Sequence, residues 1–179
     1  MRNDGSQAVN YAYHYDLHGN VVRIVDANGN ETTRAYDFLD RPIKQTYPDG
    51  TVVTYTRDKV SNLASRTDAN GTTVTNTYDD LHRLIARDID RGENVLGVTS
   101  ETYRYDGLGR LVFTTDDQGN DVDFTYDMAS RLTAETNNAQ SVGYVYDNNS
   151  NLTNITYPSG KTFDRSFDQG DRLTDVDGV

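Results

Sequence analysis

Hydrophobic and polar residues alternate in short stretches that recur along this chain. In residues 122–126, Val122, Phe124 and Tyr126 occupy every second position, with Asp and Thr between them. Residues 53–56 show the same alternation. Because successive side chains of a strand point to opposite faces, a period of two predicts strands with one face more buried. The large rings on that face are expected to be buried and to supply most of the core volume.

An internal repeat of about 21 residues organises these strands. A pair formed by an aromatic residue and Asp recurs with steps of 21, 21, 21, 27, 21, 20 and 21 residues. Asp is present in all eight copies, and only Arg57 replaces the aromatic residue. The pairs are Tyr15-Asp16, Tyr36-Asp37, Arg57-Asp58, Tyr78-Asp79, Tyr105-Asp106, Tyr126-Asp127, Tyr146-Asp147 and Phe167-Asp168. A fixed period of this length is the signature of a repeat architecture.

Other positions recur in the same frame and predict two turns per copy. Four residues after the Asp stands Arg or Asn, followed in six copies by Leu, as in Arg110-Leu111. We expect the Asp to cap backbone N–H groups of the turn, and the Arg or Asn to bond carbonyls of the neighbouring copy. Residues with positive φ are expected at Gly19, Asp40, Ser61, His82, Gly109, Ser130 and Ser150. A second turn should be closed by a glycine 14 residues after the aromatic position, namely Gly29, Gly50, Gly71, Gly92, Gly119 and Gly160, with Gln140 breaking the series.

The pattern therefore predicts one β-hairpin per copy. Because a lone hairpin is only marginally stable in water, we expect the copies to pair side by side. The predicted fold class is all-β, with tandem hairpins forming a curved or spiralling antiparallel sheet. Residues 1–10 are expected to form a lead-in tail, residues 11–175 one continuous array, and residues 176–179 a C-terminal tail. A six-residue insertion within residues 88–100 should form a longer loop.

Composition and charge narrow the possible partners. The chain carries 28 acidic and 17 basic side chains, a formal net charge of −11, which argues against nucleic-acid binding. It has no cysteine, so neither disulfides nor cysteine-bound zinc are expected. No apolar run is long enough to span a membrane, and the first residues lack the apolar stretch of a signal peptide. We expect the chain to be a fragment whose export signal, if any, lies elsewhere.

Candidate chemistry is sparse, and we expect no catalytic, cofactor-binding or metal-binding residues. His14, His18 and His82 fall at unrelated repeat positions and are better explained as solvated or turn-packing side chains. The carboxylates follow the repeat, which favours turn capping over acid–base catalysis. Residues 116–121 offer oxygen ligands for calcium, but the spacing of known calcium loops is absent, so an ordinary acidic turn is favoured.

The pattern Tyr-Asp-x-x-Gly-Arg/Asn-Leu, seen in residues 105–111 and 15–21, strongly resembles the RHS/YD repeat. The resemblance runs from about Tyr11 to Leu173. It implies a segment of the hollow β-shell with which bacterial Rhs proteins and the C components of Tc toxins enclose a toxin, and which teneurins use in cell adhesion. Its implied partners are other repeats and an enclosed cargo, and its implied location is secreted or at the bacterial surface. The family's self-cleavage segment contains Asp-Pro, which this chain lacks, so no protease is implied.

Carbohydrate binding or cell adhesion is the alternative function, because exposed tyrosines can stack on sugar rings. Solvent-facing tyrosines along one margin would favour glycan binding, whereas rings packed between neighbouring strands would favour a wall. The strands at the two ends of the array, near residues 11–15 and 162–167, are expected to have unpaired edges that allow weak self-association.

Overall fold

The computed structural model describes residues 10–178 as an all-β protein of 16 antiparallel strands whose order in the sheet follows their order in the chain. The expected fold class of tandem hairpins in one open antiparallel sheet is confirmed. The strands are β1 (Ala12–Tyr15), β2 (Val21–Val25), β3 (Glu31–Tyr36), β4 (Pro42–Thr46), β5 (Val52–Arg57), β6 (Leu63–Thr67), β7 (Thr73–Tyr78), β8 (Leu84–Asp90), β9 (Ser100–Tyr105), β10 (Leu111–Asp116), β11 (Val122–Tyr126), β12 (Leu132–Asn137), β13 (Gln140–Tyr146), β14 (Leu152–Thr156), β15 (Thr162–Phe167) and β16 (Leu173–Gly178).

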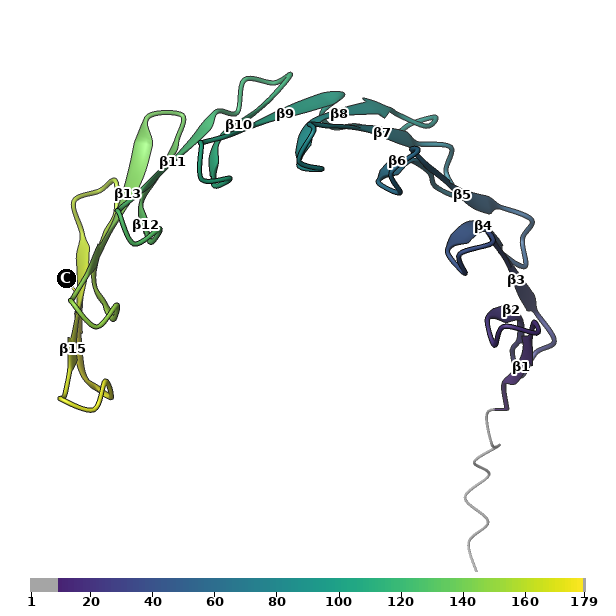
Figure 1. Cartoon of the computed structure of the whole chain (residues 1–179), viewed down its shortest axis with the longest axis horizontal. Helices are drawn as coiled ribbons and strands as arrows, with labels where there is room; N and C mark the ends of the chain where they lie inside the picture. Colours follow the sequence, from purple (N-terminus) through teal and green to yellow (C-terminus); the bar gives the residue numbers. More distant parts are fainter. Residues whose placement is uncertain (1–9, 179) are drawn as a thin grey trace, which may run out of the picture. The chain divides into compact units, whose positions relative to one another are not determined.

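The chain forms two compact units. The first comprises Met1–Arg83 and Arg87–Gly97, and the second comprises Leu84–Ala86 and Val98–Val179. Within each unit the strands lie side by side and are joined by short turns along both margins (Figure 1). Residues 91–99, the loop between β8 and β9, contain most of the insertion expected within residues 88–100.

Odd-numbered strands show the expected alternation most clearly. In β3, Thr32, Arg34 and Tyr36 are half-buried while the residues between them are exposed, and β11 repeats the pattern. The even-numbered strands β2, β6 and β10 are half-buried at every position, whereas β16 is exposed throughout. The hydrophobic pattern therefore predicts one strand of each hairpin better than the other.

A β-bulge explains part of this difference. In the seven described hairpins that end in the aromatic–Asp pair, the register shifts beside the aromatic position, as between Thr125 and Tyr126 opposite β12. A bulge places two residues opposite one, which interrupts the alternation and increases the local twist. Sequence periodicity alone did not reveal it.

The expected core of buried rings is wrong. Among residues 10–178, Val53 is the only apolar side chain that is almost fully covered, with 3% exposed. The recurring rings of Tyr36, Tyr78, Tyr126 and Tyr146 are half-buried, and Tyr15 is 59% exposed. The rings lie on a single-layered sheet, so they are shielded by neighbouring side chains of the same face and not by a second layer.

The C-terminal end also differs from expectation. β16 continues to Gly178, so residues 176–178 belong to a strand instead of forming a tail. β15 pairs with β14 on one side and β16 on the other, so the edge expected near residues 162–167 lies in β16. The N-terminal edge is β1, as expected. Residues 1–9, which make up most of the expected lead-in tail, lie outside the described part of the chain.

Within residues 10–178 there is no helix of the length and apolar character needed to cross a membrane.

Candidate functional site

The recurring aromatic–Asp pair sits where an odd-numbered strand enters a tight turn. We use the term YD turn for the five residues from the recurring Asp to the Arg or Asn four positions later. In every YD turn the N–H of the fourth residue donates to the carbonyl of the Asp, as from Gly109 to Asp106 at 3.0 Å. The eight YD turns are residues 16–20, 37–41, 58–62, 79–83, 106–110, 127–131, 147–151 and 168–172.

The Asp of each YD turn caps two backbone N–H groups. Oδ1 of Asp106 accepts from the N–H of Leu108 at 2.9 Å and of Arg110 at 3.0 Å. The same two bonds occur in the other seven YD turns. A short carboxylate so placed satisfies backbone donors that the strand ladder leaves unpaired. This is the role expected from the sequence.

The fourth residue of each YD turn has positive φ. Gly19 and Gly109 have φ of 88° and 81°, and the remaining turns use other residue types. These are Asp40, Ser61, His82, Ser130, Ser150 and Asp171, with φ between 57° and 77°. Polar residues with short hydrogen-bonding side chains tolerate this region best, although all of them are less suited to it than glycine.

The opposite turns use glycine at the same geometric position. Gly29, Gly50, Gly71, Gly119 and Gly160 have φ between 80° and 86°. Gly92 was placed in this series from its spacing, but it does not belong there. A Cβ on Gly92 would lie 2.2 Å from the carbonyl oxygen of Asn70, so this glycine permits a close approach of two backbone segments. The insertion after β8 displaces it from the turn.

The fifth residue of each YD turn binds the second oxygen of the capping Asp. Arg110 Nε donates to Asp106 Oδ2 at 2.7 Å, and its Nη2 lies 2.6 Å from the same oxygen. Asn20 donates through Nδ2 to Asp16 Oδ2 at 3.0 Å. The sequence predicted contacts from this residue to the neighbouring copy, but not this bond within its own turn.

These bonds shift the acidity of the capping carboxylates. The side-chain hydrogen bond from Arg41, supported by two backbone N–H donors, lowers the pKa of Asp37 to about 2. The backbone and side-chain bonds from Asn20 lower the pKa of Asp16. Beside it, the hydrogen bond to Asp40 raises the pKa of His18. The carboxylates are therefore held in their ionised form, which suits hydrogen-bond acceptors and not general acids.

At two junctions an Arg in the fifth position also reaches the next YD turn. Arg110 Nη1 donates to the carbonyl of Asp127 at 3.1 Å, and Arg131 Nη1 donates to that of Asp147 at 2.9 Å. Each guanidinium also covers the ring before the next Asp, with Cζ 4.7 Å from the Tyr126 centroid and 4.8 Å from the Tyr146 centroid. The expected bonds from Arg to carbonyls of the neighbouring copy are present at these two junctions.

Where Asn replaces Arg, the junction is built from side chains instead of the expected carbonyls. Asn20 donates to Asp40 Oδ1 at 2.7 Å, and Asn151 donates to Asp171 Oδ1 at 2.8 Å. Asn62 lies 3.2 Å from His82 Nδ1. At the six junctions within a unit, Arg is followed by Ser at the positive-φ position, and Asn is followed by Asp or His. The long Arg side chain is thus paired with the small Ser, and the shorter Asn side chain is paired with the larger Asp or His.

The recurring tyrosines are anchored at their hydroxyl ends. Tyr126 donates to the carbonyl of Leu111 at 2.8 Å, so the recurring Leu contributes its backbone as well as its side chain. Equivalent bonds link Tyr36 to Val21, Tyr78 to Leu63 and Tyr105 to Leu84. Each ring therefore spans two strands of its own face, which is the arrangement expected of a wall.

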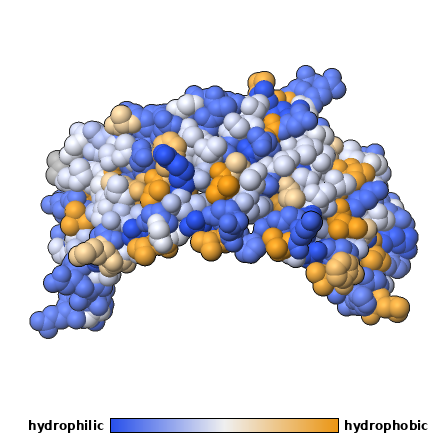
Figure 2. Space-filling view, turned by 45° about the horizontal axis from the view of Figure 1, so that its top comes forward, coloured by the Kyte–Doolittle hydropathy of each residue, from blue (hydrophilic) through white to orange (hydrophobic). Residues whose placement is uncertain are grey.

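The second and third residues of the YD turns carry exposed apolar side chains. Leu17 and Met128 are completely exposed, and Phe38 is 86% exposed. Val60, Leu81 and Leu108 occupy similar positions and are also exposed. On the face seen in Figure 2, apolar residues form separate small patches on a mostly hydrophilic surface. We call these six residues the apolar turn tips.

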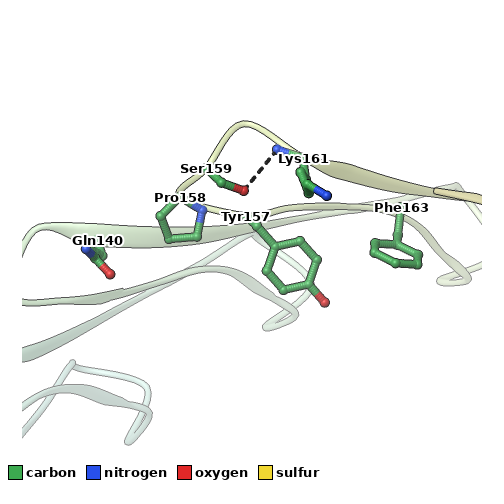
Figure 3. Close-up of a pocket in the computed structure, with 6 residues that line it drawn as sticks. All are labelled: Gln140, Tyr157, Pro158, Ser159, Lys161 and Phe163. Atoms are coloured by element: carbon green, nitrogen blue, oxygen red, sulfur yellow. Dashed lines mark hydrogen bonds between the residues drawn. The ribbon is translucent and has the colours of Figure 1, made fainter. Parts of the chain in front are cut away.

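An open aromatic pocket lies at the turn between β14 and β15. Tyr157 and Phe163 project from the same side of the ribbon, with Gln140 and Lys161 nearby (Figure 3). Their ring centroids are 5.9 Å apart in an edge-on arrangement, and the pocket volume is about 640 Å³. The Phe163 ring also lies over Gly178 of β16, where a Cβ would come within 2.7 Å of it.

Within the described residues, no group of three His, Asp or Glu side chains is arranged to hold a metal ion. The three histidines have different partners. His14 Nε2 lies 2.9 Å from Arg23 Nη2, whereas His18 and His82 take part in junctions between YD turns.

Comparison with known proteins assigns these turns to a repeat family. The family model described as RHS Repeat matches residues 15–52 and 39–73, and the model described as Teneurin YD-shell matches residues 58–177. The second match alone covers more than half of the chain. The repeated hairpins and their YD turns define a repeat shell protein. The chain belongs to the RHS/YD-repeat family.

Solved structures of Tc toxins have a similar fold. A TcdB2-TccC3-Cdc42 crystal structure matches with a TM-score of 0.77 and 18% identity, over 93% of this chain and 10% of that chain. A TcdB2-TccC3 structure without its hypervariable C-terminal region gives a TM-score of 0.78 at the same identity and coverage. The Photorhabdus luminescens Tc holotoxin pore gives 0.74 at 18% identity, over 92% of this chain and 10% of that chain. The chain thus spans about a tenth of the length of these proteins. No curated protein sequence matches it.

Proposed function

We propose that this chain is a wall segment of an RHS/YD shell that encloses a toxin or effector cargo, and that it has no catalytic activity of its own. The observation that carries the proposal is the linkage of successive YD turns, which is present at five of the six junctions within the two units. Arg110 and Arg131 each bind their own turn, the next turn and the ring between them. A single-layered sheet held by such links can enclose a volume without a hydrophobic core of its own.

The apolar turn tips support a role in holding cargo. Exposed apolar side chains in a mostly hydrophilic, acidic surface are suited to contact with incompletely folded polypeptide. We infer that the protein carrying this wall is secreted or displayed on a bacterial surface, where its other repeats complete the shell. The ionised state of the capping carboxylates agrees with a structural and not a catalytic role.

Protease protection of the cargo tests the wall function. In the full-length protein that carries this array, we expect a protease-resistant cargo segment. The paired substitutions Arg110→Ala and Arg131→Ala remove two junctions and should expose that segment. Lys59→Ala removes a positive charge from a turn without removing a junction, and should leave protection intact. Full cleavage in the unsubstituted protein, or unchanged protection in the double variant, would contradict the proposal.

Carbohydrate binding is a second candidate because of the aromatic pocket at Tyr157 and Phe163. Two half-exposed rings beside an amide and an ammonium group are suited to stacking on a sugar and bonding its hydroxyls. Tyr157→Ala should abolish binding on a glycan array. Tyr47→Ala is the matched control, since Tyr47 begins the corresponding Pro-containing turn but Val53 stands where Phe163 does. Absence of glycan binding, or its survival in Tyr157→Ala, would eliminate this candidate.

A further inference from the structure

A cavity in the first unit lies between two successive YD turns, residues 58–62 and 79–83. Its volume is about 550 Å³. The residues that line it include three that bear carboxylates, one amide of a YD turn, a phenol ring and an imidazole: Asp58, Asp79, Asp80, Asn62, Tyr78 and His82. Two acidic turns and one ring face thus surround an open space.

The equivalent space in the second unit is filled by an arginine of the chain itself. The residues 48 positions later in the chain occupy the same places in the repeat. Asp58, Asn62, Tyr78, Asp79 and His82 correspond in this way to Asp106, Arg110, Tyr126, Asp127 and Ser130. The Arg110 guanidinium bonds the Asp106 carboxylate and the Asp127 carbonyl and covers the Tyr126 ring. Arg131 does the same one copy later. This set of groups therefore binds a guanidinium twice in the same molecule.

Asn62 is too short to fill that space. Its Nδ2 donates to Asp58 Oδ2 at 2.8 Å and lies 3.2 Å from His82 Nδ1. The Tyr78 ring lines this cavity, and the short Asn62 side chain bonds Asp58 instead of covering the ring. The Asp79 carbonyl accepts the His82 N–H at 2.9 Å and retains a second lone pair. A ring face and a carbonyl lone pair are thus available in the cavity.

The other two Asn junctions are closed differently. Asp40 and Asp171 accept the amides of Asn20 and Asn151, so a carboxylate bridges the two turns directly. His82 stands at the corresponding position beside Asn62, and Asp80 also lines the cavity. Arg83 pairs with the Asp79 carboxylate at 2.6 Å, so Asp58 and Asp80 are the carboxylates left to attract a cationic guest.

We propose that this cavity binds the guanidinium group of an arginine side chain on a partner polypeptide. The guest takes the place that Arg110 and Arg131 occupy in their own junctions. Its N–H groups bond the Asp79 carbonyl and the Asp58 or Asp80 carboxylate, while its plane stacks on Tyr78. The guest completes the junction that Asn62 leaves open.

The test is a titration of the 179-residue chain with N-acetyl-arginine amide, followed by nitrogen-15 NMR. We expect shifts confined to residues 58–62 and 76–83, with a dissociation constant on the order of millimolar, as a cation–π contact plus one charge-assisted pair allows. The uncharged citrulline analogue should bind at least about tenfold more weakly because it lacks the charge-assisted bonds. The lysine analogue should also bind more weakly, since it has no planar fork.

The variant Asn62→Arg is expected to lose binding of the arginine analogue. Arg stands at this position in five of the eight YD turns, so the variant is expected to fold, to fill the cavity and to abolish the shifts. Asn20→Arg adds the same charge at a junction closed by Asp40 and should leave them unchanged. The proposal is overturned by absence of shifts in the parent, equal binding of citrulline or lysine analogues, survival of binding in Asn62→Arg, or its loss in Asn20→Arg. The wall function does not depend on the outcome.

Discussion

At the scale of single residues, the fifth position of the YD turn decides how two repeats are joined. Arg110 binds one carboxylate oxygen of its own Asp through Nε and Nη2, donates to the next turn and covers a ring, whereas Asn20 and Asn151 bond only the two carboxylates. Planar guanidinium groups are suited to this combination because they bond in the plane and stack on their faces. The aromatic position before the next Asp is therefore part of the arginine site.

The single copy without an aromatic residue shows the cost of losing that ring. Arg57 stands at the repeat position that Tyr126 and Tyr146 occupy beneath Arg110 and Arg131, so the ring that Arg41 would cover in the same way is absent. Among the described residues, Arg41 Nη1 and Arg57 Nε are the two buried side-chain nitrogens with no hydrogen-bond partner. Unsatisfied buried donors and like charges both destabilise a fold.

Restoring the ring should therefore stabilise the protein. We expect Arg57→Tyr to raise the free energy of unfolding by about 1 kcal/mol, through one cation–π contact and the removal of an unpaired donor. Urea denaturation of parent and variant measures the change. The reverse substitution, Tyr126→Arg, places Arg beside Arg110 and should destabilise the second unit. A neutral or destabilising effect of Arg57→Tyr would show that Arg57 has contacts that compensate for the missing ring.

The capping carboxylates make stability dependent on acid pH. The pKa of Asp37 is lowered to about 2 in the folded protein from an ordinary value of 3.8, chiefly by the side-chain bond from Arg41. A depressed folded-state pKa contributes stability above the unfolded-state value, and that contribution is lost as pH falls through the folded value. We therefore expect the melting temperature to fall between about pH 4 and pH 2.

The variant Asp37→Asn measures how much a single capping carboxylate contributes to this pH dependence of the melting temperature. The variant keeps an acceptor for the backbone N–H groups but loses the ion pair with Arg41. It should melt lower than the parent at pH 7, and the difference should shrink as pH approaches 2. Asp123→Asn removes the same charge from an exposed strand position and should preserve the parent's profile. Parallel pH profiles for parent and Asp37→Asn would contradict the linkage.

At the scale of elements, the sequence predicts the hairpins and their turns well because both depend on local chemistry. Alternation and the 21-residue period identify the strands, and Asp106 with Gly109 identifies a YD turn. The bulge beside each aromatic residue is missed because it changes the register and not the residue pattern. The degree of ring burial is missed because alternation shows which face a side chain takes, but not whether another layer covers that face.

The links between turns are partly predictable. Contacts from Arg to the next copy follow from its length, but the ring it covers and the choice of partner at the positive-φ position involve residues about 20 positions apart. The pairing of Arg110 with Ser130, and of Asn151 with Asp171, is visible only when the two turns are brought together. Gly92 shows a different error. Its spacing matches the glycines of the opposite turns, but it lies outside those turns and permits a close approach of two backbone segments.

The pairing between long and short side chains predicts a coupling between two positions. Arg110→Asn should destabilise the second unit, because the contacts to Asp127 and Tyr126 are lost. Adding Ser130→Asp recreates the Asn151–Asp171 type of junction. A double-mutant cycle should give a favourable coupling free energy of about 0.5–1 kcal/mol, typical of residues in direct contact. Strictly additive effects in urea denaturation would show that the two positions do not act together.

At the scale of the whole molecule, the sheet formed by residues 10–178 ends in two edge strands, β1 and β16. Tyr11, Tyr13 and Tyr15 are each at least half exposed along the first edge. At the second, the Arg172 side chain is 82% exposed, whereas the Arg110 side chain is only 23% exposed. Open edges offer backbone donors and acceptors to other strands. Among residues 10–178, no YD turn follows Arg172 and no junction arginine precedes Tyr15.

We therefore expect head-to-tail self-association of the isolated chain, with β16 of one copy beside β1 of the next. The net charge of −11 opposes it at low salt, so association should increase with ionic strength as that repulsion is screened. Such pairing places Arg172 over Tyr15 and beside Gly19, a small residue of the kind that suits an arginine junction. Because the two surfaces differ, the contact does not close on itself and should give short stacks.

Sedimentation velocity across a series of salt and protein concentrations tests this expectation. Arg172→Ala removes the junction contact and should shift the association to several-fold higher protein concentration, since a cation–π contact and its charge-assisted bonds are lost. Lys59→Ala changes the net charge equally at a turn away from both edges and should associate like the parent. A strictly monomeric chain under every condition would mean that the edges do not recruit strands. Equal weakening by both substitutions would attribute the effect to net charge and not to the junction.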